Sequence, residues 1–228
     1  MPTILLVRHA QASFGTADYD VLSDVGAEQT RLLAAALARR RLNVTRICSG
    51  SARRQLDTAE GCRGAFGVEV EVEVDERWNE YETEEVLVHH GGAAAGLDGV
   101  GPDGREITSR EFQAILDTAL DEWVASGEAT PATQSWPSFL GSRNGALDDL
   151  AGRLGGGETG LVFTSGGVIA AICARLLGDR PELFPRLNRV LVNTGITKLA
   201  VGRAGTSLIT FNEHAHIDEG GGALLTYR

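Results

Sequence analysis

The sequence predicts a three-layer α/β/α sandwich built on a mostly parallel sheet, with an inserted helical cap. Toward both ends of the chain, short apolar runs of strand length alternate with longer segments of helical periodicity, as in βαβ units. Between residues 84 and 157 this alternation lapses, and helical patterns and a glycine-rich loop replace it. A chain of 228 residues fits one such domain. We therefore expect a single domain over residues 1–228, with residues 84–157 forming a cap over the site.

The first expected strand ends in two chemically active side chains. Residues 4–7 form an apolar run that suits an interior strand, and Arg8 and His9 follow it directly. Ligands of open α/β sheets bind beyond the carboxyl ends of strands, so both side chains are expected at that edge. An imidazole can act as a nucleophile, and a guanidinium can hold a phosphoryl group. A single Arg-His pair is nevertheless a weak signal and also fits ordinary surface residues.

The next elements follow in chain order. Ser23 or Asp24 is expected to cap the first helix, which runs to about residue 41. A second strand over residues 44–48 leads through small residues into a second helix. The strict alternation of Val and Glu over residues 68–74 predicts a third strand with one solvated face, near an edge of the sheet.

The cap and the C-terminal part contain the remaining expected elements. In the cap we expect a glycine-rich loop and two helices, at residues 91–104, 111–125 and 147–154. After the cap we expect three strands, at residues 161–164, 190–201 and 207–211, and one helix at residues 168–177. The strand region at 190–201 is interrupted by Asn193, Thr194 and Gly195.

Composition limits the classes of function. The net charge is −10, from 21 Lys+Arg against 31 Asp+Glu, which argues against a nucleic-acid or anionic-membrane surface. Lys198 is the only lysine, so a phosphate pocket would be built from arginine. Three cysteines without C-x-x-C spacing, Cys48, Cys62 and Cys173, predict neither a disulfide framework nor a zinc site. With no signal-like start and no apolar run of membrane length, we expect a soluble cytoplasmic enzyme without metal or cofactor.

One glycine-rich run imitates a cofactor motif. Residues 155–160 match the G-x-G-x-x-G pattern of dinucleotide-binding loops. Such a loop must follow a strand and open a helix, whereas this run precedes an expected strand. We therefore expect a turn here.

Four further motifs follow Arg8 and His9 in order. They read LSDVGAEQ, SGSARRQLDTA, WNEY and VFTSGGVI, at residues 22–29, 49–59, 78–81 and 162–169. In this order and spacing the chain resembles the histidine phosphatase superfamily, also called the phosphoglycerate mutase-like family, from residue 3 to about 216. Each motif is short, so the specificity lies in their combination. The resemblance implies hydrolysis of phosphomonoesters without a metal, through a phosphohistidine.

The resemblance also implies roles for single residues. His9 is the expected nucleophile, and Arg8 and Arg54 are the expected phosphate ligands. Arg54 is preferred to Arg53 because the family spacing places an arginine four positions before the threonine of a Thr-Ala pair, here Thr58. That spacing also puts Arg54 and Thr58 on one helix face.

Glu80 is the expected general acid. A leaving alkoxide needs a proton, and a carboxyl shielded by Trp78 and Tyr81 can hold one near neutral pH through a raised pKa. The alternative is that Glu80 belongs merely to an acidic loop, since Glu82, Glu84 and Glu85 follow it. The order of the family motifs favours catalysis.

The chain departs from the family pattern at several phosphate-binding positions. Ser165 stands where relatives carry a second histidine before Gly-Gly, and we expect its hydroxyl and the Gly166 amide to bind phosphate. The exchange of imidazole for hydroxyl costs about 1–2 kcal/mol, roughly tenfold in rate. Ala10 and Gly15 replace a glycine and an asparagine that are common in relatives. Gln11 and Ser13 are the expected substitutes for those polar contacts, with a structural role as the alternative.

Two histidine pairs lie outside the motifs. His214 and His216 follow the last expected strand and could bring an imidazole to the position of the missing histidine. An H-x-H pair at a strand end is more often a structural element, and a metal site needs a third ligand. His89 and His90 lie beside the glycine-rich loop and are expected to be exposed, with substrate contact as the alternative.

Two other functions compete with hydrolysis. A phosphoglycerate mutase would return the phosphoryl group to a sugar acid, but mutases carry a longer segment than residues 14–21 before the first helix. A weakly active or inactive phospho-ligand binding protein would follow from Ser165, although such a protein needs no proton donor such as Glu80. The expected partner is a small phosphorylated substrate, and we expect the cap to determine which substrate binds. Binding of nucleic acid or of a membrane is not expected. A homodimer is left open by the sequence.

Overall fold

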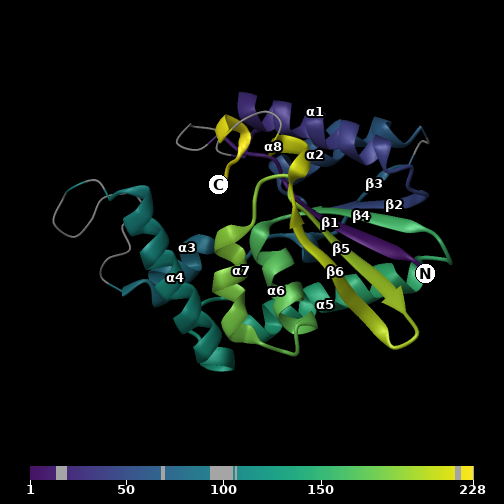
Figure 1. The fold of residues 1–228 in the computed structure, drawn as a ribbon. Coiled ribbons are helices and arrows are strands. Elements are labelled where there is room, and N and C mark those ends of the chain that lie inside the picture. Colours follow the sequence, from purple (N-terminus) through teal and green to yellow (C-terminus); the bar gives the residue numbers. More distant parts are fainter. Residues whose placement is uncertain (14–19, 68–69, 93–104, 106, 219–221, 228) are drawn as a thin grey trace.

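The computed structural model describes residues 1–13, 20–67, 70–92, 105, 107–218 and 222–227. Its strands are β1 (Thr3–Arg8), β2 (Val44–Ser49), β3 (Val72–Val74), β4 (Thr159–Thr164), β5 (Ile196–Gly202) and β6 (Gly205–Glu213). They form one sheet in the order β3-β2-β4-β1-β5-β6 (Figure 1). Neighbours from β3 to β1 are parallel, whereas β5 is antiparallel to both β1 and β6. The sheet is therefore mostly parallel, as predicted, with the short β3 at one edge.

Helices cover both faces of the sheet, which confirms the three-layer prediction (Figure 1). On one face lie α1 (Asp24–Arg39) and α2 (Arg53–Arg63). On the other lie α5 (Trp136–Arg153) and α6 (Gly166–Leu176). A parallel sheet with helices on both faces buries its central strands completely, which explains why their sequences are continuous apolar runs.

The first strand divides its side chains between two cores. Leu5 and Val7 pack in the core on the side of α1 and α2. Ile4 and Leu6 pack in the core on the side of α5 and α6. Successive side chains of a strand point to opposite faces, so burial on both faces requires every one of these residues to be apolar. The polar residues Arg8 and His9 then begin where both cores end.

The start of α1 is determined by a capping residue and by a close contact between the helix and the loop after His9. Ser23, rather than Asp24, is the capping residue, because its Oγ accepts a hydrogen bond from the Gly26 amide at 3.0 Å. At Gly26 a Cβ atom would lie 2.1 Å from the Gln11 carbonyl oxygen. Only glycine lets the helix approach the loop that follows His9.

The inserted segment contains more helix than predicted. The expected helix at 111–125 is α4 (Ser109–Ser126), and α3 (Thr83–His90) was not expected. The helix predicted at 147–154 is α5, which already begins at Trp136. Ser135 caps it and Pro137 lies in its first turn, where a missing N–H costs no helical hydrogen bond. Most of the expected loop at 91–104 lies outside the described residues.

A cluster of buried aromatic rings joins the insertion to the sheet-covering helices. Trp123 of α4 contacts Trp136 and Phe139 of α5. It also contacts Phe184, the first residue of α7 (Phe184–Val190), and Tyr81. All five rings belong to the same core as Ile4 and Leu6. The residue after Glu80 is therefore held by packing between three helices.

The C-terminal part differs from the prediction at one point. The strand region expected at 190–201 begins only at Ile196, because Val190 ends α7 and Thr194 adopts a left-handed conformation with φ of 61°. The last expected strand is β6, and α8 (Ala215–Asp218) follows it. Short 3-10 turns complete the described chain at Gly64–Phe66, Glu76–Trp78, Gly127–Ala129, Pro181–Leu183 and Gly222–Leu224.

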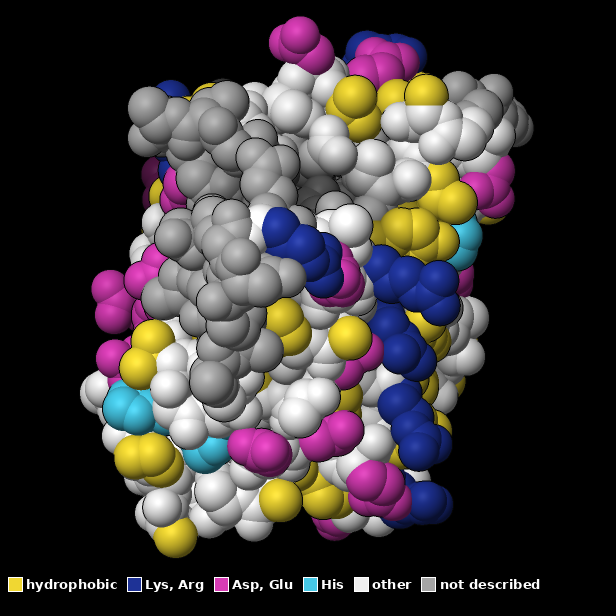
Figure 2. Space-filling model, turned by 90° about the vertical axis from the view of Figure 1, so that its left-hand side faces the viewer, with side chains coloured by type: hydrophobic (Ala, Val, Ile, Leu, Met, Phe, Trp, Pro, Cys, Tyr) yellow, Lys and Arg dark blue, Asp and Glu magenta, His cyan; other side chains and the backbone are white. Residues whose placement is uncertain are grey.

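The side of the molecule that carries α3 and α4 has a mixed surface (Figure 2). Basic side chains gather along one edge of this face, and acidic side chains lie scattered among neutral ones. No helix within the described ranges is long and apolar enough to cross a membrane. Among those same residues there is no group of three or more His, Cys, Asp or Glu side chains that could hold a metal ion.

Candidate active site

His9 lies at the carboxyl end of β1, buried between β1 and β4. Its amide donates to the carbonyl oxygen of Thr164 at 2.8 Å, and only 7% of the residue is exposed. Nδ1 of the ring lies 2.8 Å from the carbonyl oxygen of Ala10. A carbonyl oxygen can only accept, so Nδ1 carries the proton and Nε2 is unprotonated. Nε2 lies 3.3 Å from Nε of Arg54, which is the donor in this contact.

The surroundings of His9 keep its ring neutral. Burial lowers its pKa well below the usual 6.5, and the positive charges of Arg54 and Arg8 lower it further. The hydrogen bond from Nδ1 to Ala10 opposes this effect only in part. At neutral pH, Nε2 is therefore available as a nucleophile.

Two guanidinium groups act electrostatically on the imidazole of His9. Arg8 donates to the carbonyl oxygen of Leu191, and a Cβ atom on Gly166 would lie 3.6 Å from its Nε. Arg54, in the first turn of α2, is only 17% exposed and forms an ion pair with Asp20. Its neighbour Arg53 is 59% exposed and contacts Asp57 at 3.6 Å. Of the two neighbouring arginines, the structure thus brings Arg54 to His9.

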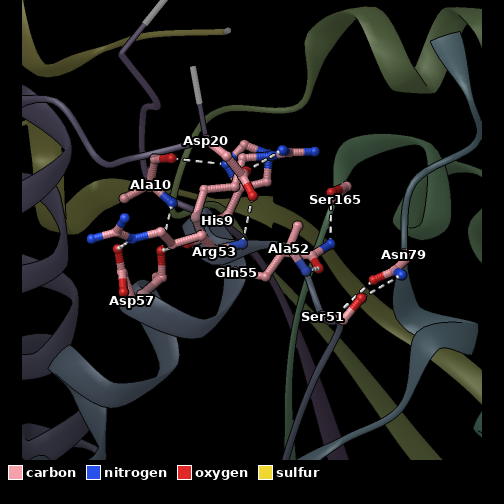
Figure 3. Close-up of polar contacts among 12 residues, drawn as sticks. His9, Ala10, Asp20, Ser51, Ala52, Arg53, Gln55, Asp57, Asn79 and Ser165 are labelled. Atoms are coloured by element: carbon pink, nitrogen blue, oxygen red, sulfur yellow. Dashed lines mark hydrogen bonds and ion pairs between the residues drawn. The ribbon is translucent and has the colours of Figure 1, made fainter. Parts of the chain in front are cut away.

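Asp20 is a charged member of the site that sequence reasoning missed. One of its carboxylate oxygens accepts from Arg54, and the other accepts from the Arg53 amide at 2.6 Å (Figure 3). The carboxylate thus occupies the start of α2, where an anion is favoured by free amides and by the helix dipole. The start of α2 is therefore suited to bind an oxyanion. No local motif distinguishes Asp20 from Asp18 in the sequence, and residues 14–19, including Gly15, lie outside the described part.

Glu80 follows the 3-10 turn at Glu76–Trp78 and faces the start of α6. Its Oε2 accepts from the Gly167 amide at 3.0 Å, and its Oε1 accepts from the Tyr81 amide at 3.2 Å. Burial raises the pKa of this carboxyl, although the amides of Gly167 and Tyr81 and the charges of Arg54 and Arg8 oppose the rise. Arg8 and Arg54 therefore act electrostatically on both Glu80 and His9, which places the two titratable groups in one site.

Gly167 is required by the position of Glu80. In Gly167→Ala the added carbon would lie 2.1 Å from Glu80 Oε1 and 2.6 Å from Cε1 of the packed Tyr81 ring. We expect turnover to fall about 10²-fold because the carboxyl is displaced, with a loss of about 1–3 kcal/mol in unfolding free energy. Gly152→Ala on α5 is the control, since nothing lies within 4 Å of the new carbon. Steady-state kinetics and urea unfolding measure both effects, and unchanged turnover in Gly167→Ala contradicts the role of this contact.

Ser165 lies beneath the site in a fully buried position. It is 0% exposed, and its Oγ accepts from Nε2 of Gln55 at 2.8 Å (Figure 3). Gln55 Nε2 also lies 3.2 Å from the carbonyl oxygen of Trp78, so it links α2 to the segment that carries Glu80. At Gly50 a Cβ atom would lie 2.0 Å from Gln55 Oε1, so this link needs a glycine. Gln55 was not predicted as a functional residue, and the role of Ser165 in phosphate binding stays a prediction.

The two expected substitutes for polar contacts, Gln11 and Ser13, lie in the loop after His9. The side-chain oxygen of Gln11, Oε1, accepts from the Ser23 hydroxyl at 2.8 Å. The backbone amide of Gln11 donates to Gln29 Oε1 at 2.9 Å. The side-chain oxygen of Gln11 is therefore engaged at the start of α1. The Ser13 amide donates to the Val21 carbonyl oxygen at 2.8 Å. Binding of phosphate by Gln11 or Ser13 stays a prediction.

A second network, also missed from the sequence, holds the backbone of His9. Asn193 donates through Nδ2 to the His9 carbonyl oxygen at 3.0 Å, and the Thr194 amide donates to the Arg8 carbonyl oxygen at 3.0 Å. Asn193 Oδ1 in turn accepts from the Thr226 hydroxyl at 2.9 Å. The C-terminal segment thus helps to fix the backbone position of His9.

Three of the remaining histidines make polar contacts outside the pair formed by His9 and Arg54, whereas His89 is exposed, as expected. His216 Nε2 lies 3.1 Å from Thr194 Oγ1, and His214 Nδ1 lies 2.6 Å from the Asn212 carbonyl oxygen. These contacts place His216 behind the loop that supports His9. The expectation that His90 is exposed is wrong: it is 7% exposed and contacts Thr130 Oγ1 at 2.8 Å, because α3 packs against α4.

His216 is expected to make stability depend on pH. Burial, aided by the charges of Arg40 and other cations, lowers its pKa to about 4. The unfolded chain binds a proton near pH 6.5 and the folded chain only near 4, so unfolding free energy should fall as pH drops through this window. Urea unfolding between pH 7 and 4 should show a smaller decline for His216→Asn than for His89→Asn, which changes an exposed imidazole. Equal declines would contradict this assignment.

Comparisons with known proteins identify the family and agree with the fold. The family model described as "Histidine phosphatase superfamily (branch 1)" matches residues 4–91 and 103–214. A phosphoserine phosphatase mutant from Entamoeba histolytica, in complex with phosphoserine, has a similar structure at 20% identity and a TM-score of 0.65, covering 95% of this chain and 100% of that chain. A mycobacterial glucosyl-3-phosphoglycerate phosphatase gives 20% identity and a TM-score of 0.62, covering 93% and 99%. Bacillus stearothermophilus YhfR has a similar structure at 20% identity and a TM-score of 0.66, covering 95% of this chain and 100% of that chain. The search of curated proteins finds no match.

Proposed function

Because the chain belongs to the histidine phosphatase superfamily, we propose that it hydrolyses small phosphomonoesters without a metal, through a phosphohistidine at His9. One observation carries this proposal: the unprotonated Nε2 of His9 faces the guanidinium of Arg54, in a site whose only described carboxyl with a raised pKa is Glu80. A nucleophile, an anion-binding group and a proton donor are the three parts that this chemistry needs.

The first half of the proposed reaction transfers the phosphoryl group to the enzyme. Nε2 of His9 attacks phosphorus while the ester P–O bond breaks, and the leaving oxygen takes the proton of the Glu80 carboxyl. Arg8 and Arg54 neutralise the equatorial phosphoryl oxygens. The phosphoryl group competes with Asp20 for Arg54, since both bind the same guanidinium. Ser165, the Gly166 amide, Gln11 and Ser13 are the further proposed phosphate ligands.

The second half regenerates the enzyme. The Glu80 carboxylate takes a proton from water, the water oxygen bonds to phosphorus, and the P–N bond to His9 breaks. Inorganic phosphate leaves, with His9 neutral and Glu80 protonated again. The hydrogen bond from Nδ1 to Ala10 holds the ring orientation through both halves.

The test is hydrolysis of p-nitrophenyl phosphate between about pH 5 and 8 in the presence of a chelator, a range that spans the ordinary histidine pKa. We expect chelator-resistant turnover and, after rapid alkaline quenching, a phosphoryl group on His9 detected by mass spectrometry. Transfer of that group to monophosphoglycerate instead of water would favour a mutase. Phosphate binding without turnover on a panel of monoesters would favour the non-catalytic alternative.

A further inference from the structure

Helix α5 carries a buried arginine that belongs to none of the sequence motifs. Basic side chains on the face shown in Figure 2 stand at the surface, several beside acidic ones. Two other arginines, Arg180 and Arg189, are more than half exposed and pair with carboxylates. Arg143 is only 4% exposed. A guanidinium is rarely buried unless its environment compensates for the lost hydration.

The contacts of Arg143 lead to the residue before Glu80. Its Nη2 donates to the carbonyl oxygen of Asn79 at 2.6 Å, and its Cζ lies 3.9 Å from the ring centre of Phe139. Asn79 is held from the other side as well, because its Oδ1 accepts from the Ser51 amide at 2.7 Å. Asn79, the residue before Glu80, is therefore held between α5 and the segment that precedes α2.

This burial is energetically expensive. Nε of Arg143 is buried and has no hydrogen-bond partner among the described residues. Burial lowers the pKa of Arg143 to about 10, and the attraction of Glu80 opposes this change, so the group is a cation at neutral pH. A well-packed apolar side chain at such a position is often as stable as a buried charge or more so. A role for the charge itself explains its presence better than stability does.

We propose that Arg143 is the positioning residue for Glu80: its hydrogen bond to Asn79 directs the acid toward α6, and its charge favours the carboxylate that activates water. This inference rests on the proposed function and deepens it. It assigns to the inserted segment a part in the proton transfer, besides any part in substrate choice.

The attraction between Arg143 and Glu80 adds to larger influences on the Glu80 carboxyl. Arg8 from β1 and Arg54 from α2 also favour the carboxylate, as do the amides of Gly167 and Tyr81. Burial favours the protonated form. Removing Arg143 takes away one favourable charge and leaves the others, so the Glu80 carboxyl should hold its proton to a higher pH.

The first experiment measures this titration directly. The carboxyl infrared band that disappears in Glu80→Gln identifies Glu80, and its pH dependence is followed in a His9→Ala background, where turnover is not needed. Arg143→Met should move the titration to higher pH, and Arg143→Lys should largely restore it. The control is Arg153→Met on the same helix, since Arg153 is an exposed partner of Glu73. An unmoved titration in Arg143→Met overturns the proposal.

The second experiment measures catalysis with His9 present. Arg143→Met should lower kcat about tenfold or more with little change in KM, whereas Arg143→Lys, which restores charge without the planar donor geometry, should recover only part of it. Arg143 lines a cavity of about 420 Å³, so guanidinium ion should enter Arg143→Ala and rescue kcat. The proposal is overturned if kcat falls only in proportion to the amount of folded protein and guanidinium ion does not rescue it. If the unsubstituted protein hydrolyses no phosphomonoester, the proposed function fails, while the titration still decides the link between Arg143 and Glu80.

Discussion

Replacing His9 with alanine is expected to lower phosphomonoester hydrolysis at least about 10³-fold and to abolish the phosphoenzyme. The physical reason is that Nε2 of His9 is the lone pair that faces Arg54 at 3.3 Å, and alanine leaves no group to form the P–N bond. The measurement is kcat on p-nitrophenyl phosphate together with mass spectrometry of the quenched protein. His89→Ala is the matched control, because that imidazole is exposed on α3.

Loss of activity in His9→Ala has to be separated from loss of structure. The His9 side chain is buried, so its removal leaves a cavity that lowers the unfolding free energy. His9→Asn, which keeps more of the volume, is the second variant. Both should retain a cooperative unfolding transition and affinity for inorganic phosphate through Arg8 and Arg54. Turnover within tenfold of the unsubstituted protein in either folded variant would rule out His9 as the nucleophile.

Glu80→Gln is expected to have an effect that depends on the leaving group. With an alkyl phosphate, whose alkoxide needs a proton, kcat should fall about 10²–10⁴-fold. With p-nitrophenyl phosphate the phenolate leaves without that proton, so His9 should still be phosphorylated. Water activation is slow in the variant, and we expect a burst of one nitrophenol per enzyme followed by slow turnover. Rapid-mixing absorbance measures the burst.

Glu82→Gln is the control for Glu80→Gln, because Glu82 is an exposed carboxylate two residues away. Equal losses on alkyl and aryl substrates in Glu80→Gln, with no burst, would mean that Glu80 is not the acid. The pH dependence of activity is a second check on the roles of Glu80 and His9, because the directions of their pKa shifts are known. Burial raises the pKa of Glu80 and lowers that of His9, so the limb that reports the acid should lie above pH 4.5 and the limb that reports the nucleophile below pH 6.5.

Sequence alone predicts the features that are determined by residues close together in the chain. An apolar run of strand length places Arg8 and His9 at the end of β1, and Ser23 or Asp24 marks the start of α1, where the structure shows Ser23 as the cap. The resemblance to the histidine phosphatase superfamily, whose spacing places an arginine four positions before a threonine, predicts Arg54 rather than Arg53, and Arg54 is the one that contacts His9. The fold class was predictable because strand-length apolar runs alternate with segments of helical periodicity.

The supporting network of the site depends instead on the order of the strands. Gln55 meets Ser165 across 110 residues, Asn193 meets the His9 carbonyl across 184, and Arg143 meets Asn79 across 64. Parallel strands bring their carboxyl ends to one edge, so the loops that follow them converge there whatever their distance along the chain. No local pattern encodes these pairs, because each joins elements that are distant in the chain: Gln55 lies in α2, Arg143 lies in α5, and Asn193 lies just before β5. Tertiary structure alone therefore decided which polar side chains orient His9 and Glu80.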